Sequence, residues 1–153
     1  MKENEDVPDD LTVRRIGCGD DSLAMEAAPL FDHPPQPSWV ASFLIQPTHH
    51  LLIAYRGGRA VGFVTGVEMI HPDKGTEMFV YELGVTPDQR QRGVAKALLT
   101  ELTGVARQRR CYGMWVLTDE DNVAAVSAYR SSGAHDDGEP LMLTWDWRTP
   151  GDS

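Results

Sequence analysis

VYELGVTPDQRQRGVAKALL, residues 80–99, decides the fold because it joins a strand, a turn and a helix in one run. The residues before Pro87 are mostly apolar and predict a strand over residues 77–85, which the proline ends. After the turn, apolar residues recur at helical spacing and predict a helix over residues 94–109. The sequence therefore places a cationic turn with two arginines and a glycine between two core elements of an acidic chain.

The turn RQRGVA has the features of a phosphate-binding loop. A helix N-terminus has unsatisfied N–H groups and a partial positive charge, and both attract anions. Gly93 would let the backbone approach a ligand closely, and Arg90 and Arg92 can add charge-assisted contacts. The pattern is neither the Walker loop GxxxxGK[ST] nor the dinucleotide fingerprint GxGxxG, and an isolated RxxGxA is also compatible with a plain surface turn. The candidate phosphate-binding residues are Arg90, Gln91, Arg92, Gly93, Val94 and Ala95.

Turn and run signals place the other elements along the chain. They predict strands over residues 11–17, 51–55, 59–70, 113–118 and 141–147, helices over residues 23–31, from Ser38 and over residues 122–132, and a loop at residues 33–37. The order β-α-α-β-β-β-α-β-α-β predicts an α/β (α+β) fold with a mixed, mostly antiparallel, twisted sheet and helices on both faces. We expect one domain over residues 11–147, a disordered acidic lead at residues 1–10 and a tail at residues 148–153.

Composition narrows the possible functions. The chain has 153 residues, 41% of them apolar, and no apolar run approaches the ~20 residues that cross a bilayer. Its acidic start contains no apolar segment of a signal peptide, so we expect a cytoplasmic protein. The formal charge of −9 disfavours nucleic-acid binding and favours cationic partners. Cys18 and Cys111 lack CxxC spacing and His49-His50 lack companion ligands, so we expect free thiols and no metal site.

A second motif lies in the predicted helix over residues 122–132 and the glycine that follows it. The motif reads N-x-x-A-x-x-x-Y-x-x-x-G, and its fixed positions are Asn122, Ala125, Tyr129 and Gly133. Together with the strand, the RxxGxA turn and the amphipathic helix, it resembles the GCN5-related N-acetyltransferase (GNAT) superfamily over about residues 11–147. The resemblance implies the GNAT fold and acetyl-CoA as the acetyl donor.

The resemblance also implies how acetyl-CoA is held. The RxxGxA amides would bind the pyrophosphate, and the strand before the turn would hydrogen-bond the pantetheine arm in the manner of an added strand. Asn122 would cap its helix, contact the pantetheine amide, or do both, and Ala125 lies on the same helical face. The strand residues assigned to the pantetheine arm are Leu83, Gly84 and Val85.

Glu82 and Tyr129 are the candidates for catalysis. Tyr129 shares a helical face with Asn122, and its phenol, with a usual pKa of about 10, can protonate a leaving thiolate. The resemblance implies that role, and a tyrosine packed in the core is the alternative. Glu82 is a carboxylate among apolar strand residues, where burial without a partner is costly. We expect it to be the general base, directly or through water, and to recognise a cationic amine; a structural ion pair or an exposed edge position is the alternative.

Further acidic residues are expected around the acceptor amine. An acidic run follows the strand predicted over residues 113–118, and single acids lie on a neighbouring strand and near the end of the chain. Asp32 and His33 either line the cleft or only turn the chain, and acidic loops are often simply solvated. The candidate acceptor-binding residues are Asp32, Glu68, Glu82, Asp119, Glu120, Asp121 and Asp146.

The acceptor can be narrowed by a closer resemblance. The segments AVGFVTGVEM, MFVYELGVTPDQRQRGVAKALL, LTDEDNVAAVSAY and LTWDW are similar to type I aminoglycoside 3-N-acetyltransferases. That resemblance implies acetylation of an aminoglycoside at its 3-amino group, antibiotic resistance, a direct ternary mechanism and, at the family level, a homodimer. The chain departs from that class in having Glu82 for an aspartate and Asn122 after the acidic run. Another small polyamine or amino sugar, a protein amine, and a non-catalytic acyl-CoA sensor remain open as alternatives.

Overall fold

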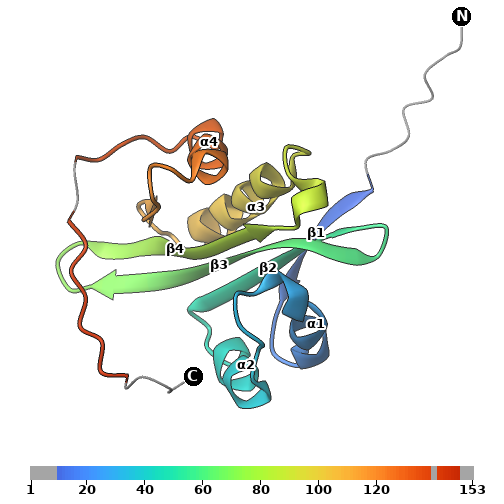
Figure 1. The fold of residues 1–153 in the computed structure, drawn as a ribbon. Helices are drawn as coiled ribbons and strands as arrows, with labels where there is room; N and C mark the ends of the chain where they lie inside the picture. The colour runs from blue at the N-terminus through green and yellow to red at the C-terminus, as the bar shows by residue number, and fades with distance from the viewer. Residues whose placement is uncertain (1–9, 139–140, 149–153) are drawn as a thin grey trace, which may run out of the picture.

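The computed structural model describes residues 10–138 and 141–148 (Figure 1). Its strands are β1 (Leu11–Ile16), β2 (His49–Arg56), β3 (Arg59–His71), β4 (Gly75–Val85) and β5 (Met114–Val116). Its helices are α1 (Asp21–Glu26), α2 (Pro37–Leu44), α3 (Val94–Gln108) and α4 (Val123–Ser131), with short 3-10 turns at Ala28–Leu30 and Pro87–Gln89. The strands form one sheet in the order β1-β2-β3-β4-β5, antiparallel except for the parallel pair β4 and β5. This mixed, mostly antiparallel α/β sheet confirms the predicted fold class.

Helices cover both faces of the sheet, α3 and α4 on one face and α1 and α2 on the other (Figure 1). The core under α3 includes the buried side chains of Leu52, Val64, Met78, Val80, Leu98 and Leu102. The core under α1 and α2 is built from Ile16, Ala24, Ala27, Leu44, Leu51, Ile53 and Phe63. Glycines on β3 let α3 approach closely, since a Cβ on Gly62 would lie 2.7 Å from Val94 Cγ1. The position of α3, and with it the turn that precedes α3, is therefore set by packing on β3.

A β-bulge interrupts the pairing of β3 with β4. Thr65 pairs with Glu82 but Gly66 pairs with Val80, so Tyr81 is an extra residue on β4. The Thr65 hydroxyl accepts a hydrogen bond from the Glu82 N–H at 3.1 Å, which fixes the bulge. Bulges re-aim side chains and increase local twist, and they are common near active sites. Here the bulge lies one residue before the predicted catalytic carboxylate.

Beyond the bulge, β4 and β5 separate. Their parallel pairing covers only Met78–Val80 of β4 with Met114–Val116 of β5. In the described part of the chain, residues 82–85 of β4 are therefore paired with β3 on one side and with no strand on the other. The sheet thus offers an open backbone edge directly after Tyr81.

Two helix boundaries differ from the predictions. The helix expected over residues 23–31 ends at Glu26 and continues as a 3-10 turn, because Pro29 has no N–H to donate to an α-helical bond. The loop expected at residues 33–37 ends one residue earlier, because Pro37 is the first residue of α2. Proline suits the first helical position, where its missing N–H would have no intrahelical acceptor.

The strand predicted over residues 141–147 is wrong. Residues 141–148 form no strand in the structure, and the side chains of Leu141, Trp145 and Trp147 are 81%, 74% and 85% exposed. A strand needs a neighbour that takes its N–H and C=O groups, and alternation in LMLTWDW carries no information about a partner. The predicted acidic lead at residues 1–10 and tail at residues 148–153 lie, apart from Asp10 and Arg148, outside the described residues.

Candidate active site

Glu82 lies on the face of the sheet that carries α1 and α2. Gly84, two residues further along β4, faces the ring of Phe63 in the core under those helices, and side chains two apart share a face. The loop before α2 brings Asp32 and His33 within electrostatic range of the Glu82 carboxyl. Burial, and then the charge of Asp32, raise the pKa of Glu82 above its usual value, while His33 lowers it. The structure thus brings together Glu82 and Asp32, two of the residues predicted to bind the acceptor.

The open edge of β4 contains the predicted pantetheine-binding residues. The side chains of Leu83 and Val85 pack against the core under α3, so only their backbone groups are available at the edge. Gly84 has no room for a side chain, since a Cβ there would lie 2.7 Å from the ring of Phe63. An unpaired strand edge can hydrogen-bond an extended segment as if it were a further strand. The geometry therefore fits an amide-containing arm lying along residues 83–85.

The RxxGxA turn has left-handed backbone at Gln91, with φ 60°, and at Gly93, with φ 81°. Such conformations gather backbone N–H groups into an anion-binding concavity, here at the N-terminus of α3. A Cβ on Gly93 would meet nothing within 4 Å, so the space outside the turn is open to a ligand. The Arg56 side chain donates to the Arg92 carbonyl at 3.3 Å and supports the turn from β2. These features of the turn fit the pyrophosphate group of CoA.

Individual side chains of the turn differ in what they can contribute. Arg90, Gln91 and Arg92 are exposed, and Arg90 Nε lies 3.4 Å from the Val85 carbonyl. Val94 is buried against β3, so it can offer only its N–H, and Ala95 is partly buried. The predicted phosphate contacts are therefore of two kinds: backbone amides at the start of α3 and exposed guanidinium groups beside them.

Helix α4 carries the second predicted motif. The Asn122 side chain caps it by accepting from the Ala125 N–H at 3.4 Å, which confirms the capping prediction. Tyr129 is 9% exposed, and burial raises the pKa of its phenol. A raised pKa keeps the phenol protonated at neutral pH, as a proton donor requires. α4, which carries Tyr129, lies on the same side of the sheet as α3 (Figure 1).

The acidic run Asp119, Glu120 and Asp121 lies exposed between β5 and α4. Because β4 and β5 are parallel, this loop leaves the sheet at the same end as residues 81–85. The run can therefore contribute negative charge near the point where the two strands separate.

The structure does not bring Glu68 into this group. Its carboxylate faces α3, where it accepts from Arg109 Nε at 2.9 Å and lies 2.8 Å from His50 Nε2. Burial is the largest influence and would raise the pKa of Glu68, but the hydrogen bonds from His50 and Arg109 outweigh it and lower that pKa. Glu68 is thus the centre of a buried ion-pair cluster that ties the end of α3 to β2 and β3.

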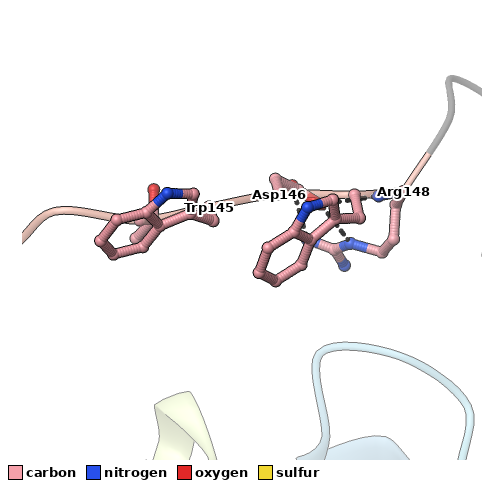
Figure 2. A pocket seen from close by; sticks show the side chains of 5 residues that line it. Trp145, Asp146 and Arg148 are labelled. Atoms are coloured by element: carbon pink, nitrogen blue, oxygen red, sulfur yellow. Dashed lines mark hydrogen bonds and ion pairs between the residues drawn. The ribbon is translucent and has the colours of Figure 1, made fainter.

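Asp146 forms an ion pair with Arg148. It is exposed on the segment 141–148 and bonds the Arg148 side chain at 3.0 Å, which lowers the pKa of the Asp146 carboxyl (Figure 2). The hollow drawn in Figure 2 is lined by residues 144–148 alone. Arg148, which lines the hollow, interacts electrostatically with Tyr81 of the bulge, so the hollow borders that part of β4.

Sequence reasoning missed the side chains that surround Glu82 on its own face. Thr65, which fixes the bulge, and the aromatic residues Phe79, Tyr81 and Trp115 were not singled out. Only the extra residue on β4 brings Glu82 to the side of Phe79 and Tyr81, and a bulge leaves no reliable sign in a single sequence. Among residues 10–138 and 141–148, no three His, Cys, Asp or Glu side chains gather into a potential metal site, and no helix is long and apolar enough to cross a membrane.

Residues 21–134 match the model of the Acetyltransferase (GNAT) family. The chain therefore belongs to this family, whose acetyl donor is acetyl-CoA. The chain is 34% identical over 144 residues to a mycothiol acetyltransferase of Geodermatophilus obscurus, covering 83% of this chain and 45% of that protein. It thus spans less than half the length of the curated relatives it matches.

Solved structures share the fold at low identity. An aminoglycoside acetyltransferase from an uncultured soil metagenomic sample, in complex with sisomicin, has a TM-score of 0.83 at 16% identity, covering 91% of this chain and 97% of that chain. The aminoglycoside N-acetyltransferase AAC(6′)-Iy, in complex with CoA, has a TM-score of 0.71 at 19% identity, covering 90% of this chain and 95% of that one. These likenesses show the GNAT fold.

Proposed function

We propose that the protein transfers the acetyl group of acetyl-CoA to an amine of an aminoglycoside, at the 3-amino group, and so confers resistance. The observation that carries this proposal is the position of Glu82: a partly buried carboxylate beside Asp32, at the point where β4 bulges and leaves β5. A negatively charged pair next to an open strand edge suits a cationic amine that must meet a thioester.

Acetyl-CoA supplies the activated acetyl group. In this proposal, the backbone of Leu83, Gly84 and Val85 binds its pantetheine arm, and the amides of residues 93–95 with Arg90 and Arg92 bind its pyrophosphate. The open edge of β4 and the free space outside Gly93 support this arrangement. Asn122 and Ala125 at the start of α4 complete the pocket, with the Asn122 amide nitrogen as a donor to the arm.

In this proposal, Glu82 accepts a proton from the acceptor and Tyr129 donates a proton to the leaving thiolate. Glu82, directly or through a water that it holds, accepts the proton that the ammonium group must lose before its nitrogen attacks the acetyl carbon. As the new N–C bond forms and the C–S bond breaks, Tyr129 donates its phenolic proton to the leaving sulfur. The nitrogen, positively charged after the attack, then loses its second proton, which returns the Tyr129 phenolate to the phenol through water, while the proton on Glu82 passes to solvent. The raised pKa values of both groups support these roles, since Glu82 becomes a stronger base and Tyr129 stays protonated.

The choice of acceptor is supported by charge and by relatives. Glu82, Asp32 and the run Asp119 to Asp121 would attract a molecule with several ammonium groups. Structural neighbours include an aminoglycoside acetyltransferase with bound sisomicin. The 3-amino position rests on the sequence resemblance alone. Similarity to mycothiol acetyltransferases supports a second candidate, an acceptor of the kind those enzymes use.

The test is incubation with 13C-labelled acetyl-CoA and kanamycin, followed by mass spectrometry and NMR of the product. We expect one added acetyl group per molecule, on the nitrogen at position 3. Acetylation at another position would keep the aminoglycoside acceptor and overturn the regiochemistry. Tight acetyl-CoA binding without acetylation of any amine would overturn the enzymatic proposal in favour of a sensor.

A further inference from the structure

Three aromatic side chains form a connected surface on β4 and β5. Phe79 and Trp115 are cross-strand partners, and their ring centroids lie 4.3 Å apart at 31°. The Tyr81 ring packs edge-on against Phe79, with centroids 5.9 Å apart at 69°. Tyr81 is 65% exposed, whereas Phe79 and Trp115 are partly buried behind it. We call Tyr81, Phe79 and Trp115 the aromatic platform.

The aromatic platform shares a face of the sheet with Glu82. Phe79 pairs with Val67 and Glu82 pairs with Thr65, and Val67 and Thr65 are two apart on β3. The neighbouring residues Met78 and Val80 point the other way, into the core under α3. Tyr81 follows Phe79 by two residues and keeps to its face, and strict alternation would put Glu82 on the other side with Met78 and Val80. The extra residue on β4 shifts the register and brings Glu82 to the face of Phe79 and Tyr81 instead. The phenol ring and the catalytic carboxylate are thus consecutive residues on one surface.

This half of the face has no helix over it in the described part of the chain. α1 packs mainly on β1 and α2, and α2 mainly on β2, while the 3-10 turn Ala28–Leu30 lies against β3 and against Gly84 of β4. Arg148 lies close enough to Tyr81 to interact with it electrostatically, so segment 141–148 borders the platform. Tyr81 keeps most of its surface accessible with that segment in place. The Tyr81 ring is therefore accessible to a molecule that approaches Glu82.

We propose that the aromatic platform stacks against a sugar ring of the acceptor while Glu82 and Asp32 hold the amine, which makes cyclic amino sugars the preferred substrate class. The inference rests on the proposed acetyl transfer and specifies its acceptor. The C–H face of a sugar ring is apolar and slightly positive, and it complements the negative face of an aromatic ring. A ring-borne ammonium group near Tyr81 gains a cation–π attraction as well. An open-chain polyamine has the charges but no ring face.

The test compares acceptors with and without a ring in the same variants. Neamine is the amino-sugar probe and spermidine the open-chain probe, with acetyl-CoA saturating and CoA release as the signal. We expect Tyr81→Ala to raise KM for neamine about fivefold or more and to change KM for spermidine less than about twofold. Tyr81→Phe keeps the ring and should keep the wild-type KM for neamine. Ile70→Ala, an equally exposed apolar side chain on the opposite face of β3, is the control for general surface effects.

Each outcome separates this inference from the proposed function. Equal losses for both acceptors in Tyr81→Ala, or no loss for either, would overturn the stacking role while leaving the acetyltransferase intact. A wild-type protein that acetylates spermidine but no amino sugar would overturn the aminoglycoside acceptor and the platform's role together. Thermal unfolding of Tyr81→Ala within the range of Ile70→Ala establishes that a change in KM does not come from misfolding.

Discussion

At the scale of single residues, Glu82 is held where burial and a like charge both raise its pKa. The folded state therefore favours the protonated carboxyl. That contribution to stability is fully present below the unfolded pKa of about 4.3 and is lost as pH rises through the raised folded pKa. Ionisation of Glu82 therefore destabilises the folded state.

Glu82→Gln should consequently be more stable than the wild type at about pH 7 and equally stable at about pH 3. Urea denaturation at the two pH values measures this difference. Glu101→Gln, at an exposed carboxyl on α3, is the matched control and should show no such change. A glutamine variant that is less stable at neutral pH would mean that the carboxylate has a stabilising partner.

Tyr129 is the second residue with an argued proton-transfer role. Tyr129→Phe removes one hydroxyl from a buried ring and keeps its packing, so we expect kcat to fall about 10²-fold while KM for acetyl-CoA changes little. Steady-state kinetics with saturating amine measures both values. A loss in kcat below about threefold would exclude Tyr129 as the general acid.

At the scale of elements, the start of α3 depends on a left-handed residue with open space around it. In Gly93→Ala the new Cβ meets no clash, but alanine at φ near 81° costs about 1–2 kcal/mol. Relaxing that strain turns the backbone amides away from a phosphate. We expect KM for acetyl-CoA to rise about tenfold. Gly104→Ala, on the same helix with equally open surroundings and ordinary backbone, should instead stabilise by about 0.5–1 kcal/mol. An unchanged KM in Gly93→Ala would remove the turn from the CoA site.

The ion-pair cluster of Glu68, His50 and Arg109 joins the end of α3 to the sheet. The pKa of Glu68 is lowered in the folded state, so Glu68 contributes stability above its unfolded pKa of about 4.3. This stability is lost as pH falls through the folded-state pKa of Glu68. Glu68→Gln should lower the free energy of unfolding at neutral pH by about 1.5–3 kcal/mol. KM for the acceptor should not change, and a large rise in that KM would restore Glu68 to the acceptor site predicted from the sequence.

The same elements show what the sequence could predict. The run at residues 80–99 carried the strand, the turn and α3, because helical spacing and Pro87 are local signals. Glu68 and Glu82 looked alike as carboxylates on neighbouring strands. In the structure they lie on opposite faces of the sheet, because the bulge at Tyr81 shifts the pairing register of β4 with β3 just before Glu82. The absent strand at residues 141–147 had correct alternation but depends on a partner elsewhere in the chain.

At the scale of the whole molecule, opposite charges are divided between two regions around the point where β4 leaves β5. Arg90 and Arg92 lie at the start of α3, where they suit an anionic cofactor, although the chain carries a net charge of −9. In the proposed function, Glu82, Asp32 and the run Asp119 to Asp121 attract the cationic acceptor. Anionic cofactor and cationic acceptor would then bind at separate positions, as direct transfer in a ternary complex requires.

The most direct test of this account is a comparison of kcat/KM for wild-type protein with acetyl-CoA and three acceptors: neamine, spermidine and a peptide with a free α-amine. The account predicts CoA release with neamine at a kcat/KM at least about tenfold above the other two, a difference of about 1.4 kcal/mol in transition-state binding. A higher kcat/KM for the peptide, or no release with neamine, would contradict it.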